Sequence, residues 1–297
     1  MKRFEGNPIL QPISSHSWES RLVFNAGAAL VGGRVHLVYR AMGNDHISRL
    51  GYATSWDGYH FNERLPDPIF VPRNEHEAEG CEDPRLTVLG DKLIMAYTAF
   101  GNRMQEKVFQ IALTSIQLSD FLEKKWTWQK SIHAFPGIRN KNAFILPQKI
   151  GAQYILFHRL DPDICIARSS SFGDWCGMKF VMGPRLKMWD SWKVGTTGPP
   201  FLLNEGWLML YHGVDFDKRY CLGVALLDKD DPSRVIYRCT EPILEPEMDY
   251  ERYGDVSNVV YSCGSVIIDG KVLVYYGGAD SVLGIATYEM AELLPKK

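Results

Sequence analysis

A carboxylic acid placed directly before a proline is the feature of this sequence with the clearest catalytic potential. Asp83 belongs to the segment Glu82-Asp83-Pro84-Arg85, which is followed at once by the hydrophobic residues 86–89. A proline fixes its own backbone and biases the preceding residue toward an extended conformation, so we expect Asp83 to be extended and rigidly held. A rigid backbone suits a carboxyl group that must keep a fixed orientation toward a substrate. The alternative is a charged turn in which Glu82 or Asp83 pairs with Arg85.

Further polar residues stand at or just after hydrophobic segments, where a buried strand does not need them. One such residue is commonly a satisfied core residue, but four separate segments show the same departure, which favours a shared polar pocket. Two charged segments add candidates, with solvated surface charge as the alternative for both. The residues at the hydrophobic segments are Arg40, His158, Arg159, His212 and Asp280, and the charged segments are 139–142, with Lys141, and 189–195, with Lys193.

The elements that must position these residues are five copies of one short pattern. A hydrophobic segment that ends in an aromatic residue or a histidine is followed by a loop and a second hydrophobic segment. The first segments are 34–40, 92–98, 153–159, 206–212 and 271–277, and their partners are 49–55, 109–115, 163–169, 220–227 and 282–288. Segments rich in Val, Ile, Leu and Tyr, separated by Gly, Asp, Asn and Pro, are typical of β-strands.

The spacing of the five copies leaves room for four short strands in each. The sequence therefore predicts an all-β chain that forms one five-bladed β-propeller domain over residues 1–297, with a β-sandwich as the alternative. Short helical turns are predicted only near 115–125 and 288–294. In a propeller the innermost strands of all blades converge on a central tunnel, so polar residues at strand ends that are far apart in sequence become neighbours there.

The composition excludes several classes of function. The formal net charge is -2, which gives no general field for a nucleic acid or an anionic membrane. No apolar run suits a signal peptide or a membrane span, so we expect a cytoplasmic protein. The six cysteines are scattered, which predicts neither a disulfide framework nor a metal site. Glycine-rich nucleotide-binding motifs are absent, so no organic cofactor is expected.

Several segments together resemble one known family. The chain resembles glycoside hydrolase family 130, the five-bladed propellers that include β-mannoside phosphorylases. Each segment is a weak signal alone, but their order along the chain is specific. They are Phe24-Asn25-Ala26-Gly27-Ala28, Arg49-Leu50-Gly51-Tyr52-Ala53, Glu82-Asp83-Pro84-Arg85, Tyr211-His212-Gly213-Val214-Asp215 and Leu226-Leu227-Asp228-Lys229-Asp230-Asp231-Pro232.

The resemblance implies an enzyme that cleaves β-mannosides with inorganic phosphate as co-substrate and without another cofactor. The expected products are α-mannose 1-phosphate, formed with inversion, and a shortened sugar. In some members the acid is thought to act through the 3-hydroxyl of the mannose. The resemblance implies Asp83 as the general acid, Asn25, Arg40, Arg49 and Asp280 as the mannosyl subsite, and Lys141, Arg159, Lys193 and His212 as the phosphate-binding set.

The residue types also favour phosphorolysis on their own. Hydrolysis of a glycoside ordinarily needs two carboxyl groups that flank the bond, whereas phosphate is itself the nucleophile and needs cations to hold it. The ends of the third and fourth repeated segments, where a second carboxylate was sought, carry His158-Arg159 and His212 instead. A β-mannosidase on the same scaffold is the first alternative, and a non-catalytic glycan-binding propeller is the second.

The sequence does not decide the finer details of the substrate. The linkage, β-1,2 or β-1,4, and the acceptor sugar depend on loops at the tunnel mouth, for which 42–47, 101–107 and 215–219 are the candidates. The oligomeric state is also open, with a symmetric homodimer as the default expectation.

Overall fold

The computed structural model describes residues 1–103 and 106–295. Residues 104–105, which belong to the predicted mouth loop 101–107, lie outside the described part. Most of the described chain is β-strand, so the all-β prediction is confirmed. The two predicted helical turns correspond to α1 and α3, and none of the helices in the described residues has the length and hydropathy of a membrane span. The helices are η1 (Ser17–Glu19), η2 (Glu75–Glu77), α1 (Leu118–Leu122), α2 (Asp249–Arg252) and α3 (Met290–Leu293).

The strands form five antiparallel units, which follow one another along the chain. The first is β2 (Leu22–Val31), β3 (Arg34–Met42), β4 (Ser48–Ser55) and β5 (Glu63–Arg64); the second is β6 (Gly80–Leu89), β7 (Lys92–Arg103), β8 (Glu106–Gln117) and β9 (Ile132–His133). The third is β10 (Lys141–Ile145), β11 (Tyr154–Leu160), β12 (Asp163–Ser169) and β13 (Cys176–Met182). The fourth is β14 (Lys193–Thr196), β15 (Phe201–Leu202), β16 (Trp207–Val214), β17 (Tyr220–Leu227) and β18 (Val235–Arg238). The fifth is β19 (Val260–Ile268), β20 (Lys271–Gly278), β21 (Val282–Glu289) and the N-terminal β1 (Lys2–Arg3).

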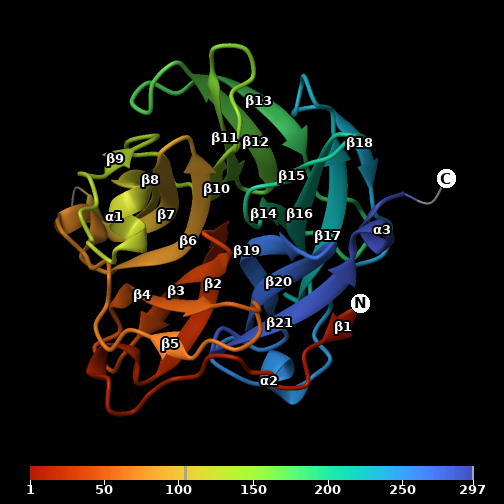
Figure 1. Cartoon of the computed structure of the whole chain (residues 1–297). Helices are drawn as coiled ribbons and strands as arrows, with labels where there is room; N and C mark the ends of the chain where they lie inside the picture. Colours follow the sequence, from red (N-terminus) through yellow and green to blue (C-terminus); the bar gives the residue numbers. More distant parts are fainter. Residues whose placement is uncertain (104–105, 296–297) are drawn as a thin grey trace.

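The first strand of each unit lies toward the middle of the molecule. Figure 1 shows β2, β6, β10, β14 and β19 around the centre, with the later strands of each unit farther out. Strand β2 packs beside both β19 and β6, so the fifth unit lies next to the first. One parallel residue pair, Ser48 with Gly80, joins the first two units into a single sheet. The repeated segments of the sequence are the second and third strands of the units.

Strands near the centre are buried on both faces, which explains their continuous hydrophobic character. Strand β16 is buried along its whole length, from Trp207 to Val214. Its side chains join a core cluster that reaches from the third unit, with Phe144, to the fifth unit, with Tyr276. Burying such apolar area stabilises a fold by about 25 cal/mol per Å². The packing between units therefore fixes where the starts of the inner strands lie.

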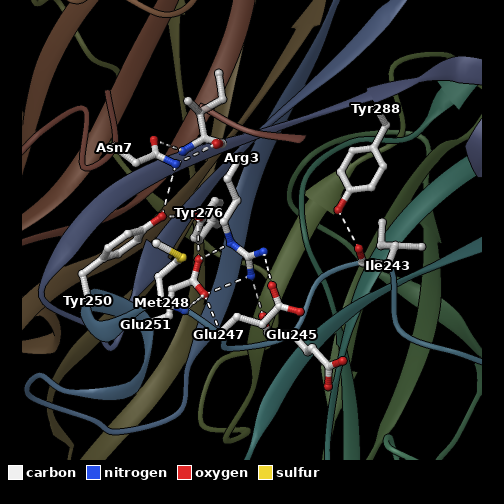
Figure 2. A network of polar contacts seen from close by, with 11 residues as sticks. Arg3, Asn7, Ile243, Glu245, Glu247, Met248, Tyr250, Glu251, Tyr276 and Tyr288 are labelled. Atoms are coloured by element: carbon white, nitrogen blue, oxygen red, sulfur yellow. Dashed lines mark hydrogen bonds and ion pairs between the residues drawn. The ribbon is translucent and has the colours of Figure 1, made fainter. Parts of the chain in front are cut away.

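A buried tyrosine–carboxylate pair fastens the segment that leads into the inner strand in four of the five units. The tyrosine lies on the strand that pairs with the inner strand, and the acid lies three residues before the inner strand, or nine in the fifth unit. The pairs are Tyr39 with Glu19 (2.9 Å), Tyr97 with Glu77, Tyr211 with Asp190 (2.9 Å) and Tyr276 with Glu251 (2.7 Å). Figure 2 shows the pair of the fifth unit, where Arg3 of β1 also binds Glu251 through Nε at 2.8 Å.

The third unit is built differently at this place. Phe157, which has no hydroxyl group, lies where the other units have tyrosine, and the segment 134–140 contains no carboxylate. The amide nitrogen of Asn140 instead lies 3.0 Å from Nδ1 of His158, and the backbone N–H of Gly137 donates to the side chain of Gln110 at 2.8 Å. Segment 134–140 therefore has neutral hydrogen bonds at the place where the other units use a charged acid.

Candidate active site

A polar cavity of about 330 Å³ lies at the starts of the inner strands and receives residues from all five units. It contains seven of the nine residues predicted from the sequence: Asn25, Arg40, Asp83, Lys141, Arg159, Lys193 and Asp280. The other lining residues are Phe109, Arg139, Asn140, Asn142, Asp161, Tyr220, Val256, Val259 and Tyr261. The strand order thus brings together side chains that are up to 255 positions apart, between Asn25 and Asp280.

A β-bulge interrupts four of the five inner strands at the level of this cavity. The pairing register shifts between Phe24 and Ala26 in β2, between Glu82 and Arg85 in β6, between Lys141 and Phe144 in β10, and between Ser262 and Gly264 in β19. A bulge adds one unpaired residue and changes the direction of its side chain. The residues Asn25, Asp83 and Asn142 occupy these bulges, and all three line the cavity.

The expected extended conformation of Asp83 is wrong. Its φ angle is 51°, in the left-handed region, and Asn25 and Asn142 have similar values of 48° and 59°. The bulge in β6 overrides the local bias of Pro84, because the ladder pairing on both sides of the bulge fixes the backbone. Such a conformation costs on the order of 1–3 kcal/mol for a residue other than glycine and persists only where its surroundings enforce it.

Buried donors surround the Asp83 carboxyl group. Oδ1 accepts hydrogen bonds from Nδ2 of Asn25 at 3.0 Å and from Nη1 of Arg40 at 3.2 Å, and the hydroxyl of Tyr261 lies 3.4 Å from Oδ2. Burial would raise the pKa of Asp83, but the charges of Arg40, Lys141 and Arg85 and the bond from Asn25 outweigh it and hold that pKa below its ordinary value. Asp83 is therefore ionised at neutral pH.

Asp280 is the second carboxyl group at this end of the cavity, and its pKa shifts the opposite way. Burial, supported by repulsion from Asp83, raises the pKa of Asp280 to about 7 against the attraction of Arg40. Two carboxyl groups that share one site are pushed apart in this way because both cannot easily be charged. Asp83 and Asp280 form what we call the carboxyl end of the cavity.

The cations gather in the third and fourth units and form the cationic end. Lys141 of β10 and Arg159 of β11 are directly paired across the two strands, and Lys193 begins β14. Burial, with the charges of Arg159 and Lys141, lowers the pKa of Lys193 to about 8. Arg159 also has an ion pair with Asp161, with Nε 2.8 Å from Oδ1. Three clustered cations make a site for an anion.

Glu82 does not line the cavity itself, but it connects Arg40 of the first unit to Lys141 of the third unit. Its carboxylate accepts from Nη2 of Arg40 at 2.8 Å and from Nζ of Lys141 at 3.0 Å. The alternative in which this segment is a turn paired with Arg85 is not what the structure has. Arg85 is fully buried and donates to the carbonyl of Thr197 at 2.6 Å and to the Tyr261 hydroxyl at 2.7 Å.

Two of the predicted residues do not line the cavity. The Arg49 side chain instead donates to the carboxylate of Asp45 at 2.7 Å and to the carbonyl of Ile47 at 3.2 Å. His212 is fully buried behind Asn142, whose amide nitrogen lies 3.1 Å from Nε2 of the imidazole. Burial and neighbouring cations, Arg159 first among them, keep the pKa of His212 well below its ordinary value. The roles predicted for Arg49 and His212 stay predictions.

The sequence reasoning missed Tyr261, which is central to the site. Its hydroxyl accepts from Arg85, lies 2.9 Å from Oδ1 of Asn142 and approaches Asp83, so it connects the second, third and fifth units. A tyrosine inside a hydrophobic strand carries no signal that separates it from core residues. Asn140 and Asn142 did have a signal, because they flank Lys141 in a charged segment that was singled out.

Comparisons with known proteins agree on one family. The model for glycoside hydrolase family 130, described as beta-1,4-mannooligosaccharide phosphorylase, matches residues 1–295. The chain is 44% identical over 302 residues to a beta-1,2-mannobiose phosphorylase of Thermoanaerobacter sp. (strain X514), with 97% of each chain covered. It is 40% identical over 300 residues to a 1,2-beta-oligomannan phosphorylase of the same strain, with 99% of this chain and 98% of that one covered.

A solved structure extends the similarity to three dimensions. The beta-1,2-mannobiose phosphorylase from Listeria innocua, in complex with beta-1,2-mannobiose, superposes with a TM-score of 0.83 at 28% sequence identity. The match covers 98% of this chain and 97% of that one. The sequence and the architecture therefore point to the same family over nearly the whole length.

Proposed function

The chain belongs to glycoside hydrolase family 130, and we propose that it cleaves β-1,2-linked manno-oligosaccharides by inverting phosphorolysis. The products are α-mannose 1-phosphate and a shortened sugar. The relatives named as β-1,2-mannoside phosphorylases support the linkage, because they match this chain at 40% and 44% identity over nearly their whole length. We also propose that the five antiparallel units are the blades of a five-bladed propeller, which the central position of the inner strands supports.

The observation that carries the proposal is the division of the cavity into a carboxyl end and a cationic end. Lys141, Arg159 and Lys193 suit a bound phosphate, which is the nucleophile, while Asp83 supplies the proton for the departing sugar. A retaining or inverting hydrolase would need a second carboxylate to act as nucleophile or base. Asp161 is the carboxylate at the cationic end, and it is engaged by Arg159. Asn25, Arg40 and Asp280 remain to hold the mannosyl ring.

Phosphate binding also shifts the protonation equilibrium of Asp83. An ionised Asp83 cannot act as an acid, and the charges of Arg40, Lys141 and Arg85 favour its ionised form. A phosphate dianion at the cationic end brings negative charge close to Lys141 and cancels part of this field. Because nearby negative charge favours the neutral form of a carboxyl group, the pKa of Asp83 rises when phosphate binds. Phosphate binding therefore makes the neutral, protonated form of Asp83 easier to reach.

The remaining parts of the proposal concern the setting of the enzyme. All six cysteines are free thiols, which suits a reducing cytoplasmic location. Inorganic phosphate is the co-substrate, and no other cofactor enters the mechanism. A symmetric homodimer is proposed on general grounds, since closed two-fold assemblies are the commonest.

The deciding experiment is cleavage of β-1,2-mannobiose with and without inorganic phosphate. We expect release of mannose and α-mannose 1-phosphate that depends on phosphate, with the anomer assigned by NMR. Equal sugar release in both conditions would establish the hydrolase alternative. β-1,4-Mannobiose in the same assay tests the linkage, and faster cleavage of that sugar would overturn the β-1,2 assignment.

The titration of Lys193 predicts how phosphate use depends on pH. Lys193 has a pKa of about 8, so it loses its charge as the pH rises through that value. We expect the KM for phosphate to rise by up to roughly tenfold between pH 7 and pH 9, because only the charged amine binds the anion. Lys193→Arg is the control, since a guanidinium stays charged over this range and should remove most of the rise. If the KM for phosphate in Lys193→Arg rose with pH as it does in the unaltered protein, Lys193 would not be the group that binds phosphate.

A further inference from the structure

Three large aromatic side chains are exposed to solvent on loops around the cavity. Trp192 is 39% exposed, Phe216 is 69% exposed and Tyr253 is 73% exposed. Exposed aromatic side chains that come together beside a pocket can mark a ligand-binding surface. None of the three lines the cavity itself.

Trp192 and Phe216 lie at the edge of the cationic end. Trp192 directly precedes Lys193, whose Nζ lies 4.4 Å from the centre of the Trp192 ring. The backbone N–H of Trp192 donates to the carbonyl of Val214 at 2.8 Å. Val214 pairs with the cavity residue Tyr220 across the turn that joins β16 to β17, and Phe216 lies in this turn. Both residues therefore lie on chain segments that adjoin the cavity residues Lys193 and Tyr220.

Tyr253 approaches the same edge from the fifth unit. It follows α2 and begins the segment 253–259, in which Val256 and Val259 line the cavity. The carbonyl of Asn258 accepts from the backbone N–H of Tyr220 at 3.0 Å, which ties this segment to the turn that carries Phe216. The three aromatics thus come from adjoining loops that share Tyr220 as a neighbour.

The size of the cavity sets what must lie outside it. Ligand pockets span about 300–1,000 Å³, and the present cavity of about 330 Å³ is at the lower end of that range. It suits one sugar ring with a phosphate. The later rings of an oligosaccharide must then extend past the rim, where flat aromatic faces can cover the apolar C–H faces of sugar rings.

We propose that Trp192, Phe216 and Tyr253 form an aromatic platform that binds mannosyl units beyond the two that flank the cleaved bond. This inference rests on the proposed function and adds to it a preference for chain length. The platform makes the enzyme more efficient on a β-1,2-linked tetrasaccharide than on the disaccharide, because only the longer chain reaches the exposed rings.

The test compares kcat/KM for β-1,2-mannotetraose and β-1,2-mannobiose in Phe216→Ala and Tyr253→Ala. We expect each variant to lower the tetraose-to-biose ratio of kcat/KM by about tenfold. Trp192 is not the primary target, since its ring contacts Lys193. Trp56→Ala is the matched control: Trp56 is 68% exposed but stacks on Arg34 after the end of β4 that points away from the cavity, and it should leave the ratio unchanged.

Two outcomes would overturn the platform. Equal losses on both sugars would indicate a structural role for the rings, and an unchanged ratio would show that longer chains do not reach them. Failure of the proposed function is distinguishable, because it would appear as phosphate-independent cleavage or no cleavage in the unaltered protein. In that case the affinity for β-1,2-mannotetraose, measured by calorimetry in the same variants, still reports on the platform.

Discussion

Asp83→Asn is expected to lower kcat for phosphorolysis of β-1,2-mannobiose by about 10²- to 10⁴-fold, which is the usual contribution of a general acid. The amide has nearly the same shape and can still accept from Asn25 and Arg40, but it has no acidic proton for the departing sugar. The fold should be retained, as checked by circular dichroism and by the thermal midpoint. Steady-state release of α-mannose 1-phosphate measures the effect.

The leaving group separates an acid from a residue that only binds. A nitrophenyl β-mannoside releases a phenolate that departs without protonation, whereas a sugar alkoxide does not. We therefore expect Asp83→Asn to cost much less activity on the nitrophenyl substrate than on mannobiose. Equal losses on both substrates would contradict the role of Asp83 as proton donor and would indicate that it only positions the mannosyl ring.

Asp280→Asn is the companion variant, because Asp280 is the second carboxyl group of the cavity and burial raises its pKa to about 7. If Asp280 binds the mannosyl ring, its loss should raise KM on both substrates without the dependence on leaving group. The reverse pattern, a leaving-group dependence for Asp280→Asn and none for Asp83→Asn, would move the acid to Asp280. The phosphate-induced rise in the pKa of Asp83 would then have no role in the reaction.

Glu251→Gln is expected to destabilise the protein by about 3–5 kcal/mol, the usual cost of removing one partner from a buried ion pair. The Glu251 side chain has no solvent exposure. It accepts from Arg3, from the Tyr276 hydroxyl and from the backbone N–H groups of Glu247 and Met248. The amide keeps the volume but turns a donor toward these donors. Denaturant unfolding at neutral pH measures the loss.

Glu247→Gln provides a matched control. Glu247 binds Nη1 of the same arginine at 2.6 Å, but its side chain is 53% exposed. Exposed pairs contribute about 0–1 kcal/mol, so this variant should be close to the unaltered protein. Interactions with Arg3, Tyr276 and the two backbone N–H groups lower the pKa of Glu251 despite its burial, so its contribution is present above the ordinary pKa of a glutamate and is lost as the pH falls. Similar losses in both variants would contradict the importance of burial.

The sequence predicted the strands well because each repeated segment has the composition of a buried strand. All five first segments and their partners are strands in the structure. The sequence also selected seven residues that line one cavity. Three of them stood out at the ends of hydrophobic segments (Arg40, Arg159 and Asp280), three lie in charged segments (Asp83, Lys141 and Lys193), and Asn25 was implied by the family resemblance alone. The pairing of β1 with β21 could not be predicted, because a two-residue strand has no periodicity to detect.

The conformation of Asp83 and the place of His212 could not be predicted for a different reason. A bulge arises from the pairing of two strands, and the local preference next to Pro84 does not contain that pairing. His212 follows the pattern of a strand end, yet Asn142 from another unit lies between it and the cavity. Both properties depend on how neighbouring units meet, which a single segment cannot reveal.

The missing tyrosine–carboxylate pair in the third unit has a consequence for local opening of the chain. Segment 134–140 leads directly to Lys141, so the entry segment that lacks such a pair carries part of the cationic end. Segments with few buried polar anchors open at a lower free-energy cost than the global unfolding reaction. Amide hydrogen exchange in 134–140 should therefore be faster than in the entry segments of the other units, and bound phosphate should slow it. Ligand-dependent protection of this kind would place the adaptable part of the enzyme where the nucleophile binds.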